Sequence, residues 1–136
     1  MPVTLKLCVP KRQVAQVEAE YIRIPSAEGN MGVLPNHAPL RCVLEPGIVR
    51  CRKADDSEEV FAVSTGIAMV RNNEVVVMAD AAERGDKIDV ERAQAAERRA
   101  RERLQSMDRS VDIDRAEVAL KRALVRLHAS EKWRGH

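Results

Sequence analysis

The spacing of apolar residues changes once along this chain, near residue 86, and that change limits the folds that the chain can adopt. Before it, apolar side chains recur mainly at every second residue in short runs, as in TLKLCV near the start. After it, they recur every three or four residues, as in VERAQAAERRARERL. A period of two is typical of strands, and a period near 3.6 is typical of helices. The sequence therefore predicts a strand-rich domain at 1–86 and a helical domain at 87–136.

The first domain consists of short apolar runs separated by turn-forming residues. TLKLCV is followed by QVEAEYIRI, RCVLEPGIVRCRK, EEVFAVST and IAMVRNNEVVVMA. Pro46-Gly47 breaks one run, and Asn72-Asn73 separates two others as a tight hairpin turn does, because Asn tolerates a positive φ. Many short strands with frequent turns favour a β-sandwich or barrel, and no helix-length pattern interrupts them. A parallel α/β sheet is therefore disfavoured.

The second domain contains two apolar stripes at helical spacing. The first stripe is formed by Ala93, Ala96, Ala100, Leu104 and Met107. The second stripe is formed by Ile113, Ala116, Leu120, Ala123 and Leu127. Asp89 and Asp112 are the predicted N-caps, because a short side-chain acceptor satisfies the free amides of a first helical turn. The short SMDRSVD connection predicts an antiparallel two-helix hairpin.

Alanine makes up much of both stripes. Alanines let two helices approach closely, but each buries little surface, so at about 25 cal/mol per Å² the seam stabilises less than a leucine-rich one. We therefore expect a hairpin that opens or undocks easily. Packing alone leaves a permanently closed hairpin as the alternative.

Charge is divided unevenly between the two domains. Residues 1–86 hold 10 Lys and Arg against 12 Asp and Glu, a net −2, and residues 87–136 hold 13 against 9, a net +4. Arg92 and Arg99 share one helical face, and Arg122 and Arg126 share another. Closing the hairpin could bring these four guanidiniums together, where a polyphosphate would relieve their repulsion through bidentate hydrogen bonds. The alternative is a solvated face in which these arginines pair with the glutamates of the helices.

Composition excludes several classes of function. The chain lacks GxxxxGK[ST], and Gly29 and Gly32 are assigned to turns rather than to a phosphate loop. No serine has a recognisable nucleophile context, so the sequence predicts no enzyme. Three cysteines without an export signal indicate reduced thiols that serve as small core residues, and no apolar run is long enough for a membrane span. Aromatic residues make up only 2%, which predicts an aliphatic core.

Several of these stretches together resemble the epsilon subunit of the bacterial rotary ATP synthase. The resemblance rests on EGNMGVLPNHAPL, GIVRCRK, AVSTGIAMVRNNEVVVMADAAERG and IDVERA, and it covers essentially the whole chain. It implies a ten-stranded antiparallel β-sandwich followed by a two-helix hairpin, at the foot of the central stalk. It also implies contacts with the gamma subunit, the c-ring and the alpha/beta catalytic head, as a peripheral part of the complex on the cytoplasmic face of the inner (plasma) membrane. In this family the hairpin can extend along gamma and block ATP hydrolysis, or stay folded and permit it.

The resemblance also implies a regulatory ATP site that holds the nucleotide without hydrolysing it. The matching positions are Glu83, Ile88, Asp89, Arg92, Ala93, Arg99, Arg122 and Arg126. Asp89 and Glu83 could accept bonds from the adenine amino group or the ribose hydroxyls, and Ile88 and Ala93 could contact the base. Whether Mg²⁺ accompanies the nucleotide is not determined by the sequence.

Other positions match the family's contacts with its neighbours. Glu28, Asn30 and His37 correspond to positions near the c-ring, and Gly66 lies on the strand that faces gamma. Thr65 stands where the family often has a glycine, and the acidic residue that often follows is missing, so the contacts with gamma are expected to differ in detail. The remaining arginines of the hairpin are expected either to contact acidic segments of the catalytic head or only to confer solubility.

The sequence leaves two rival interpretations open. The net charge of the second domain would suit a nucleic-acid-binding hairpin, although acidic residues interleave the arginines and no aromatic stacking platform is present. A self-associating helical module is the other alternative.

Overall fold

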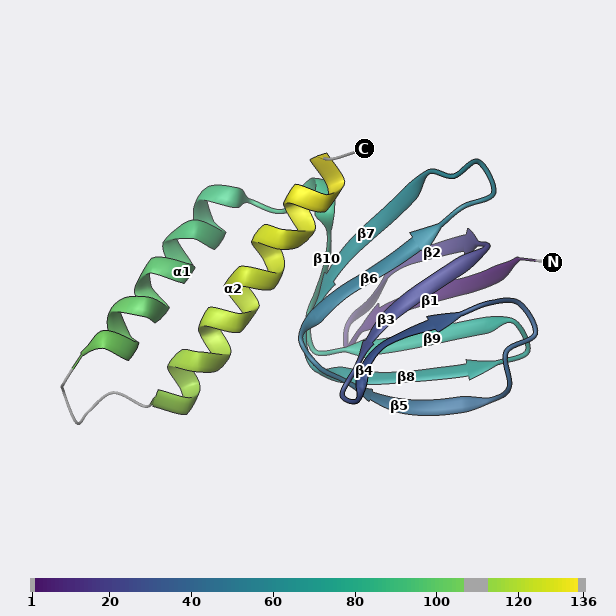
Figure 1. Cartoon of the computed structure of the whole chain (residues 1–136), viewed down its shortest axis with the longest axis horizontal. Coiled ribbons are helices and arrows are strands. Elements are labelled where there is room, and N and C mark those ends of the chain that lie inside the picture. The colour runs from purple at the N-terminus through teal and green to yellow at the C-terminus, as the bar shows by residue number, and fades with distance from the viewer. Residues whose placement is uncertain (1, 107–112, 135–136) are drawn as a thin grey trace.

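The computed structural model describes residues 2–106 and 113–134 and divides them into a β-sandwich and a docked helical hairpin (Figure 1). The strands of the sandwich are β1 (Val3–Val9), β2 (Arg12–Ala19), β3 (Tyr21–Ser26), β4 (Gly29–Val33), β5 (Leu40–Leu44), β6 (Gly47–Arg52), β7 (Glu58–Val63), β8 (Gly66–Arg71), β9 (Glu74–Ala79) and β10 (Ala82–Arg84). A short 3-10 helix, η1 (Gly85–Lys87), leads into α1 (Val90–Gln105) and α2 (Ile113–Arg134).

The ten strands form one sheet in the order β10-β7-β6-β3-β5-β8-β9-β1-β2, with β4 paired to β3 alone. The sheet curls so that its two halves face each other across the core (Figure 1). The predicted ten-stranded sandwich is therefore confirmed. All of the pairings are antiparallel except one, because β1 and β9 run parallel with Leu5 opposite Val75.

The core of the sandwich is aliphatic, as the low aromatic content predicts. Alternate residues of β1, namely Val3, Leu5 and Leu7, are fully buried, and Phe61 is the one aromatic side chain in the cluster. Cys51 is also fully buried, and that burial raises the pKa of its thiol to about 12, so the thiol stays protonated and acts as a small apolar side chain.

Two expectations for the first domain need correction. The run QVEAEYIRI was predicted as one strand, but the chain bends at Glu20, since β2 pairs with β1 while β3 pairs with β4, β5 and β6. Gly32 lies inside β4 rather than in a turn, and a Cβ there would meet the Tyr21 hydroxyl at 2.5 Å. Gly29 starts β4 with a φ of +123°, so it does make the backbone conformation that ends a turn.

The predicted Asn72-Asn73 hairpin is confirmed. Both residues have positive φ, 50° and 59°, and they join β8 to β9. Two consecutive residues in this conformation match the right-handed twist of the flanking strands. At the other end of β8, Gly66 leaves no room for a side chain, because a Cβ would lie 2.2 Å from the Met78 carbonyl oxygen.

The hairpin forms largely as the apolar stripes predict. Asp89 caps α1 by accepting a hydrogen bond from the Arg92 amide at 3.1 Å. The buried seam between the helices includes Ala93, Ala100, Ala116 and Ala123. The assignment of Ile113 to the seam is wrong, since 59% of its surface is exposed at the first position of α2. Met107 and the predicted cap Asp112 lie outside the described residues.

The helix α2 lies between α1 and the sandwich (Figure 1). The face of α2 that points toward the sandwich carries Val125 and Ala129. These two side chains pack against Val60 and Ala62 of β7 and against Ile88. This second apolar cluster is much smaller than the core of the sandwich. The hairpin is therefore closed and docked through a narrow, small-residue contact.

Candidate functional site: the junction between α2 and the sandwich

A pocket of about 270 Å³ opens where α2 crosses the edge of the sandwich. It is lined by Ala62, Val63, Ser64, Asp80, Ala81, Ala82, Glu83, Arg122, Val125 and Arg126. The sandwich wall is held by Ser64, whose hydroxyl oxygen accepts a hydrogen bond from the Ala81 amide at 2.8 Å while its own amide donates to the Ala81 carbonyl at 3.0 Å. The Thr65 hydroxyl donates to Asp80 at 3.0 Å. This wall is thus held by hydrogen bonds within the sandwich. The opposite wall of the pocket belongs to α2.

An ion pair joins the two walls. The Nε of Arg126 on α2 donates to Oε1 of Glu83 on β10, and the two side chains are 30% and 35% exposed. Glu83 therefore neutralises Arg126 in the closed hairpin. A second, more exposed pair, Lys121 with Glu45 at 3.4 Å, also links α2 to the sandwich.

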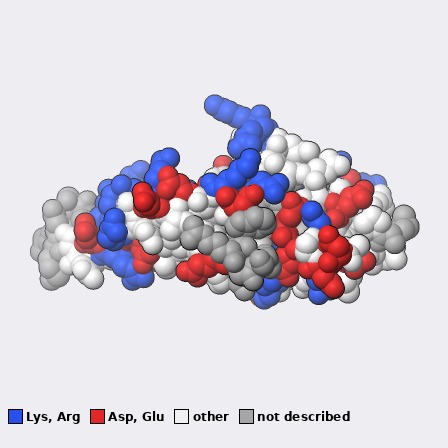
Figure 2. All heavy atoms as spheres, turned by 90° about the horizontal axis from the view of Figure 1, so that it is seen from above, with Lys and Arg blue, Asp and Glu red and all other residues white. Residues whose placement is uncertain are grey.

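Three further arginines of the predicted site are exposed and, within residues 2–106 and 113–131, have no ion-pair partner: Arg92, Arg99 and Arg122. In the alternative interpretation these arginines form a solvated face that pairs with glutamates of the helices; they are solvated, but Glu97 pairs with Arg101 at 3.0 Å. In the view from above, basic side chains are concentrated over the hairpin (Figure 2). The closed hairpin thus carries uncompensated positive charge.

Helix geometry decides which side of the hairpin these charges occupy. Each of the four arginines comes directly before a residue of the seam. The pairs are Arg92 and Ala93, Arg99 and Ala100, Arg122 and Ala123, and Arg126 and Leu127; the three alanines are buried and Leu127 is half-buried. One residue corresponds to a turn of about 100° about the helix axis, and in two antiparallel helices the positions just before the seam fall on the same flank. All four arginines therefore start from one flank of the hairpin, although only Arg122 and Arg126 line the pocket.

The other predicted nucleotide contacts have structural roles in the closed form. Ile88 is 8% exposed and packs against Val60, Ala62 and Ala129, and Ala93 is fully buried in the seam. Neither side chain is accessible to a base in this arrangement. Asp89 is occupied as the N-cap of α1, with its second carboxylate oxygen still able to accept a bond.

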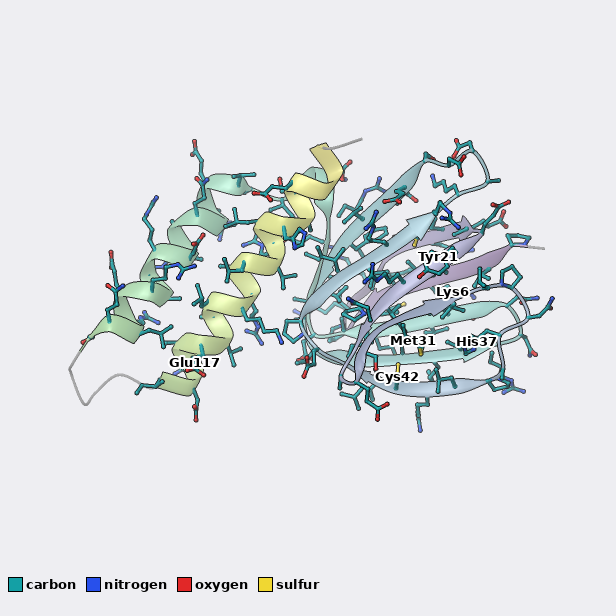
Figure 3. All side chains as sticks on the ribbon, in the orientation of Figure 1. Lys6, Tyr21, Met31, His37, Cys42 and Glu117 are labelled. Atoms are coloured by element: carbon teal, nitrogen blue, oxygen red, sulfur yellow. The ribbon has the colours of Figure 1, made fainter. Side chains whose placement is uncertain are left out.

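The predicted contacts with the c-ring are distributed along β4. Glu28 lies in the exposed turn before β4, with its amide donating to the Ser26 hydroxyl, and Asn30 is the second residue of β4. His37 lies beyond the far end of β4, on the part of the sandwich away from the hairpin (Figure 3). The structure therefore does not gather the three residues at one point.

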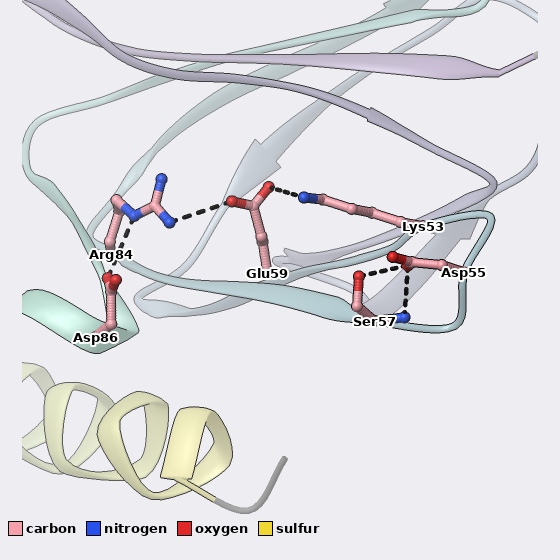
Figure 4. A network of polar contacts seen from close by, with 6 residues as sticks. All are labelled: Lys53, Asp55, Ser57, Glu59, Arg84 and Asp86. Atoms are coloured by element: carbon pink, nitrogen blue, oxygen red, sulfur yellow. Dashed lines mark hydrogen bonds and ion pairs between the residues drawn. The ribbon is translucent and has the colours of Figure 1, made fainter.

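A polar network fixes the linker that leads into the hairpin (Figure 4). Glu59 of β7 bonds Lys53 at 3.4 Å and Arg84 of β10 at 3.2 Å, and Arg84 also bonds Asp86 of η1 at 3.2 Å. In the nearby turn, hydrogen bonds from the Ser57 hydroxyl and amide lower the pKa of Asp55. The linker is thus tied to the sandwich independently of α2.

Sequence reasoning missed several residues of this region. Ser64, Asp80 and Ala81 line the pocket only because β7 and β10 meet there, and their local sequence carries no signal for it. Among the described residues no cluster of His, Cys, Asp and Glu could hold a metal ion. None of the described helices combines the length and apolarity that crossing a bilayer requires.

A β-sandwich that carries a docked two-helix hairpin defines a two-domain fold class, and comparisons with known proteins match both of its domains. The family described as "ATP synthase, Delta/Epsilon chain, beta-sandwich domain" matches residues 2–85, and the "long alpha-helix domain" of the same chain matches residues 86–131. The chain therefore belongs to the ATP synthase delta/epsilon chain family.

Individual relatives agree with this family. The chain is 46% identical over 107 residues to the ATP synthase epsilon chain of Synechococcus elongatus, which covers 79% of this chain and 77% of that one. It is 47% identical over 102 residues to the epsilon chain of Carboxydothermus hydrogenoformans, with 75% of each chain covered. The predicted resemblance to epsilon subunits is thus confirmed.

Solved structures show the same fold within ATP synthases. The Euglena gracilis mitochondrial ATP synthase, described as an OSCP/F1/c-ring assembly, contains a chain that matches with a TM-score of 0.78 and 27% identity, covering 99% of this chain and 82% of that one. A chain of the Tetrahymena thermophila mitochondrial ATP synthase central stalk and c-ring matches with a TM-score of 0.64 over 96% and 97% of the two chains, and at 14% identity it shows the fold alone.

We expect the Arg126–Glu83 pair to contribute measurably to docking of the hairpin. In a double-mutant cycle with Glu83→Gln and Arg126→Gln, the coupling in the free energy of unfolding should be about 0.5–1 kcal/mol, because the pair is only partly exposed yet still reached by solvent. Denaturant unfolding of the full chain measures it.

The matched control is the exposed Arg101–Glu97 pair within α1, for which about 0.3 kcal/mol is expected. A coupling for Arg126 and Glu83 no larger than that of the control pair would contradict a docking role.

Proposed function

We propose that this chain is a central-stalk subunit of a proton-translocating rotary ATP synthase, without catalytic activity of its own, that helps couple c-ring rotation to the catalytic head. In this proposal the sandwich holds the gamma subunit and meets the c-ring at Glu28, Asn30 and His37. The chain is then peripheral, at the cytoplasmic face of the membrane. Family membership supports this assignment, since the matches cover both domains.

The hairpin is proposed as a regulatory switch. When docked it binds ATP without hydrolysing it and permits hydrolysis by the head, and when extended along gamma it inhibits hydrolysis. The observation that carries this proposal is the common flank of Arg92, Arg99, Arg122 and Arg126. Only a closed hairpin brings the two arginine pairs together, so a ligand that needs both pairs favours the closed form.

The chemistry of the arginine flank suits a polyphosphate. Guanidiniums offer paired N–H donors that match phosphate oxygens, and three of the four lack an ion-pair partner within the described side chains. Glu83 holds Arg126 in the closed form and would have to exchange its partner, freeing its carboxylate to accept bonds from a ribose or an amino group. Ile88 and Ala93 shape the site from beneath, since both are buried.

The size of the pocket sets a further condition. Its 270 Å³ lies slightly below the roughly 300–1,000 Å³ that is usual for ligand sites. A nucleotide would therefore extend from the pocket across the open flank toward Arg92 and Arg99 instead of being enclosed.

Mass action gives the strength of such a switch. A ligand that binds only the docked form stabilises it by RT ln(1 + [ATP]/Kd), which is about 2.7 kcal/mol at a concentration one hundred times Kd. The small-residue seam and the narrow contact at Val125 and Ala129 keep the opposing equilibrium modest. That amount is then sufficient to reverse the preference between the two forms.

The sandwich offers a surface for gamma on the face away from its core. Val43, Ile67 and Met78 stand directly opposite one another on β5, β8 and β9 and are 61%, 43% and 56% exposed. Three large apolar side chains in one exposed row are typical of a protein contact. Gly66 precedes Ile67 and packs tightly on Met78, which keeps β8 and β9 close beneath this row.

We expect ATP binding by the isolated chain to depend on the arginine flank. A calorimetric titration with ATP should show saturable binding to the wild type and affinity at least tenfold weaker in Arg92→Ala/Arg126→Ala, because each lost charge-assisted hydrogen bond removes about 1.5–3 kcal/mol. Arg71→Ala, at an exposed position of β8, should bind as the wild type does.

No binding, or equal binding by the wild type and the double variant, would remove the nucleotide site. A salt-dependent titration with a DNA oligonucleotide tests the nucleic-acid alternative in the same preparation.

We expect Ile67→Glu to weaken binding to the gamma subunit by tenfold or more, because it places a charge at the centre of an apolar row. Surface-immobilised gamma with the full chain in solution measures the dissociation constant. Val118→Glu is the matched control, since Val118 is 46% exposed on α2 and does not belong to this row. Equal loss of affinity in both variants would contradict the assignment of the row to gamma.

A further inference from the structure

A second groove lies along α2 on the flank opposite the arginine flank. It has a volume of about 270 Å³ and is lined by Arg23, Asn30, Gly47, Ile48, Arg50, Val125 and His128. Val125 also lines the first pocket, so α2 rests on the sandwich between the two hollows. By helix geometry His128 leaves α2 on one side of Val125, and Arg122 and Arg126 leave it on the other.

The sheet wall of this groove brings two like charges together. Arg23 of β3 and Arg50 of β6 are directly opposite each other in an antiparallel pair. Like charges in this position repel and destabilise the pairing. Arg50 is partly compensated, because its Nε and Nη2 donate to Glu58 at 3.2 and 2.6 Å. Arg23 has no hydrogen-bond or ion-pair partner among the side chains that the structure describes.

Among the residues that the structure describes, no carboxylate lines the groove itself. Besides the two arginines its lining consists of Asn30, Gly47, Ile48, Val125 and His128. Glu58 lies instead in the adjoining hollow of about 160 Å³, which is lined by Tyr21, Arg23, Arg50, Arg52 and Glu58. In that hollow Arg52 is already held over the Tyr21 ring at 5.3 Å. The groove therefore presents Arg23, which forms no ion pair with the described side chains, and Arg50 lies beside it.

We propose that this groove is a binding site for inorganic phosphate. Arg23 offers the paired N–H donors that match two phosphate oxygens. Arg50, the side-chain amide of Asn30 and the imidazole of His128 supply further donors from three other elements: β6, β4 and α2. The volume suffices for a phosphate ion together with ordered water.

The residues of this groove come from both the sandwich and the hairpin. Arg23, Asn30 and Arg50 belong to the sandwich, whereas His128 belongs to α2. An anion held by both bridges the two domains and stabilises the docked hairpin by mass action. Phosphate, a product of ATP hydrolysis, would thus act on the hairpin through residues separate from the proposed nucleotide site.

The test is a titration of the full chain with inorganic phosphate at constant ionic strength, followed by calorimetry and by the imidazole NMR signals. We expect saturable binding that shifts the signals of His128 and leaves those of His37 unchanged. Arg23→Gln should weaken binding about tenfold or more, since it removes the charged, bidentate donor. His128→Gln should weaken it severalfold, and Arg71→Gln should have no effect.

Two further measurements keep the test independent of folding and of the nucleotide site. Because Arg23→Gln removes a like-charge contact, it should raise the melting temperature in phosphate-free buffer while abolishing the rise that phosphate causes in the wild type. Arg122→Gln should leave phosphate binding intact while it weakens the binding of ATP. Phosphate binding that survives Arg23→Gln, that is lost in Arg122→Gln, or that is absent from the wild type would overturn the proposal.

Discussion

The packing of α2 against α1 and against the sandwich determines how firmly the hairpin is held. One face of α2 closes the alanine seam with α1, and the other rests on the sandwich through Val125 and Ala129. Both contacts bury small side chains, so each is close but provides little buried apolar area. The ion pair of Arg126 with Glu83 adds a charged link, which the proposed nucleotide would replace. In the proposed switch, a helix held in this way leaves the sandwich without disturbing the rest of the fold.

The sandwich, in contrast, is held together by a large apolar core. Its core of Leu5, Leu7, Ile22, Ile24 and their neighbours is fully buried and continuous, and Gly66 lets β8 and β9 approach closely. The apolar row of Val43, Ile67 and Met78 is built on this rigid part. The extensively buried core of the sandwich therefore contrasts with the small contact that holds the hairpin.

Local signals in the sequence were sufficient for the features that depend on neighbouring residues. Asn72-Asn73 specified its turn through backbone preference, and Asp89 specified the start of α1 through its side-chain acceptor. The alanine stripes specified a seam, although Ile113 at the first turn of α2 lies outside it.

Features that depend on distant residues could not be predicted in this way. The parallel pairing of β1 with β9, and the bend at Glu20 between β2 and β3, follow from how the sheet closes. The contact of Glu83 with Arg126 and the juxtaposition of Arg23, Arg50 and His128 join residues far apart in the chain. The four arginines were found in sequence because helical spacing relates them, but their relation to the sandwich required the docked position of α2.

Native-state hydrogen exchange on the isolated chain tests the central claim, that docking of the hairpin is weak relative to the sandwich, most directly. Amides of α1 and α2 should exchange through a sub-global opening whose free energy is well below that of the amides in β1 and β9, and whose dependence on denaturant is smaller than that of global unfolding. If the helices and the strands instead exchange with the same free energy, through global unfolding alone, the hairpin is an inseparable part of the fold, and a weakly docked, switchable hairpin is contradicted.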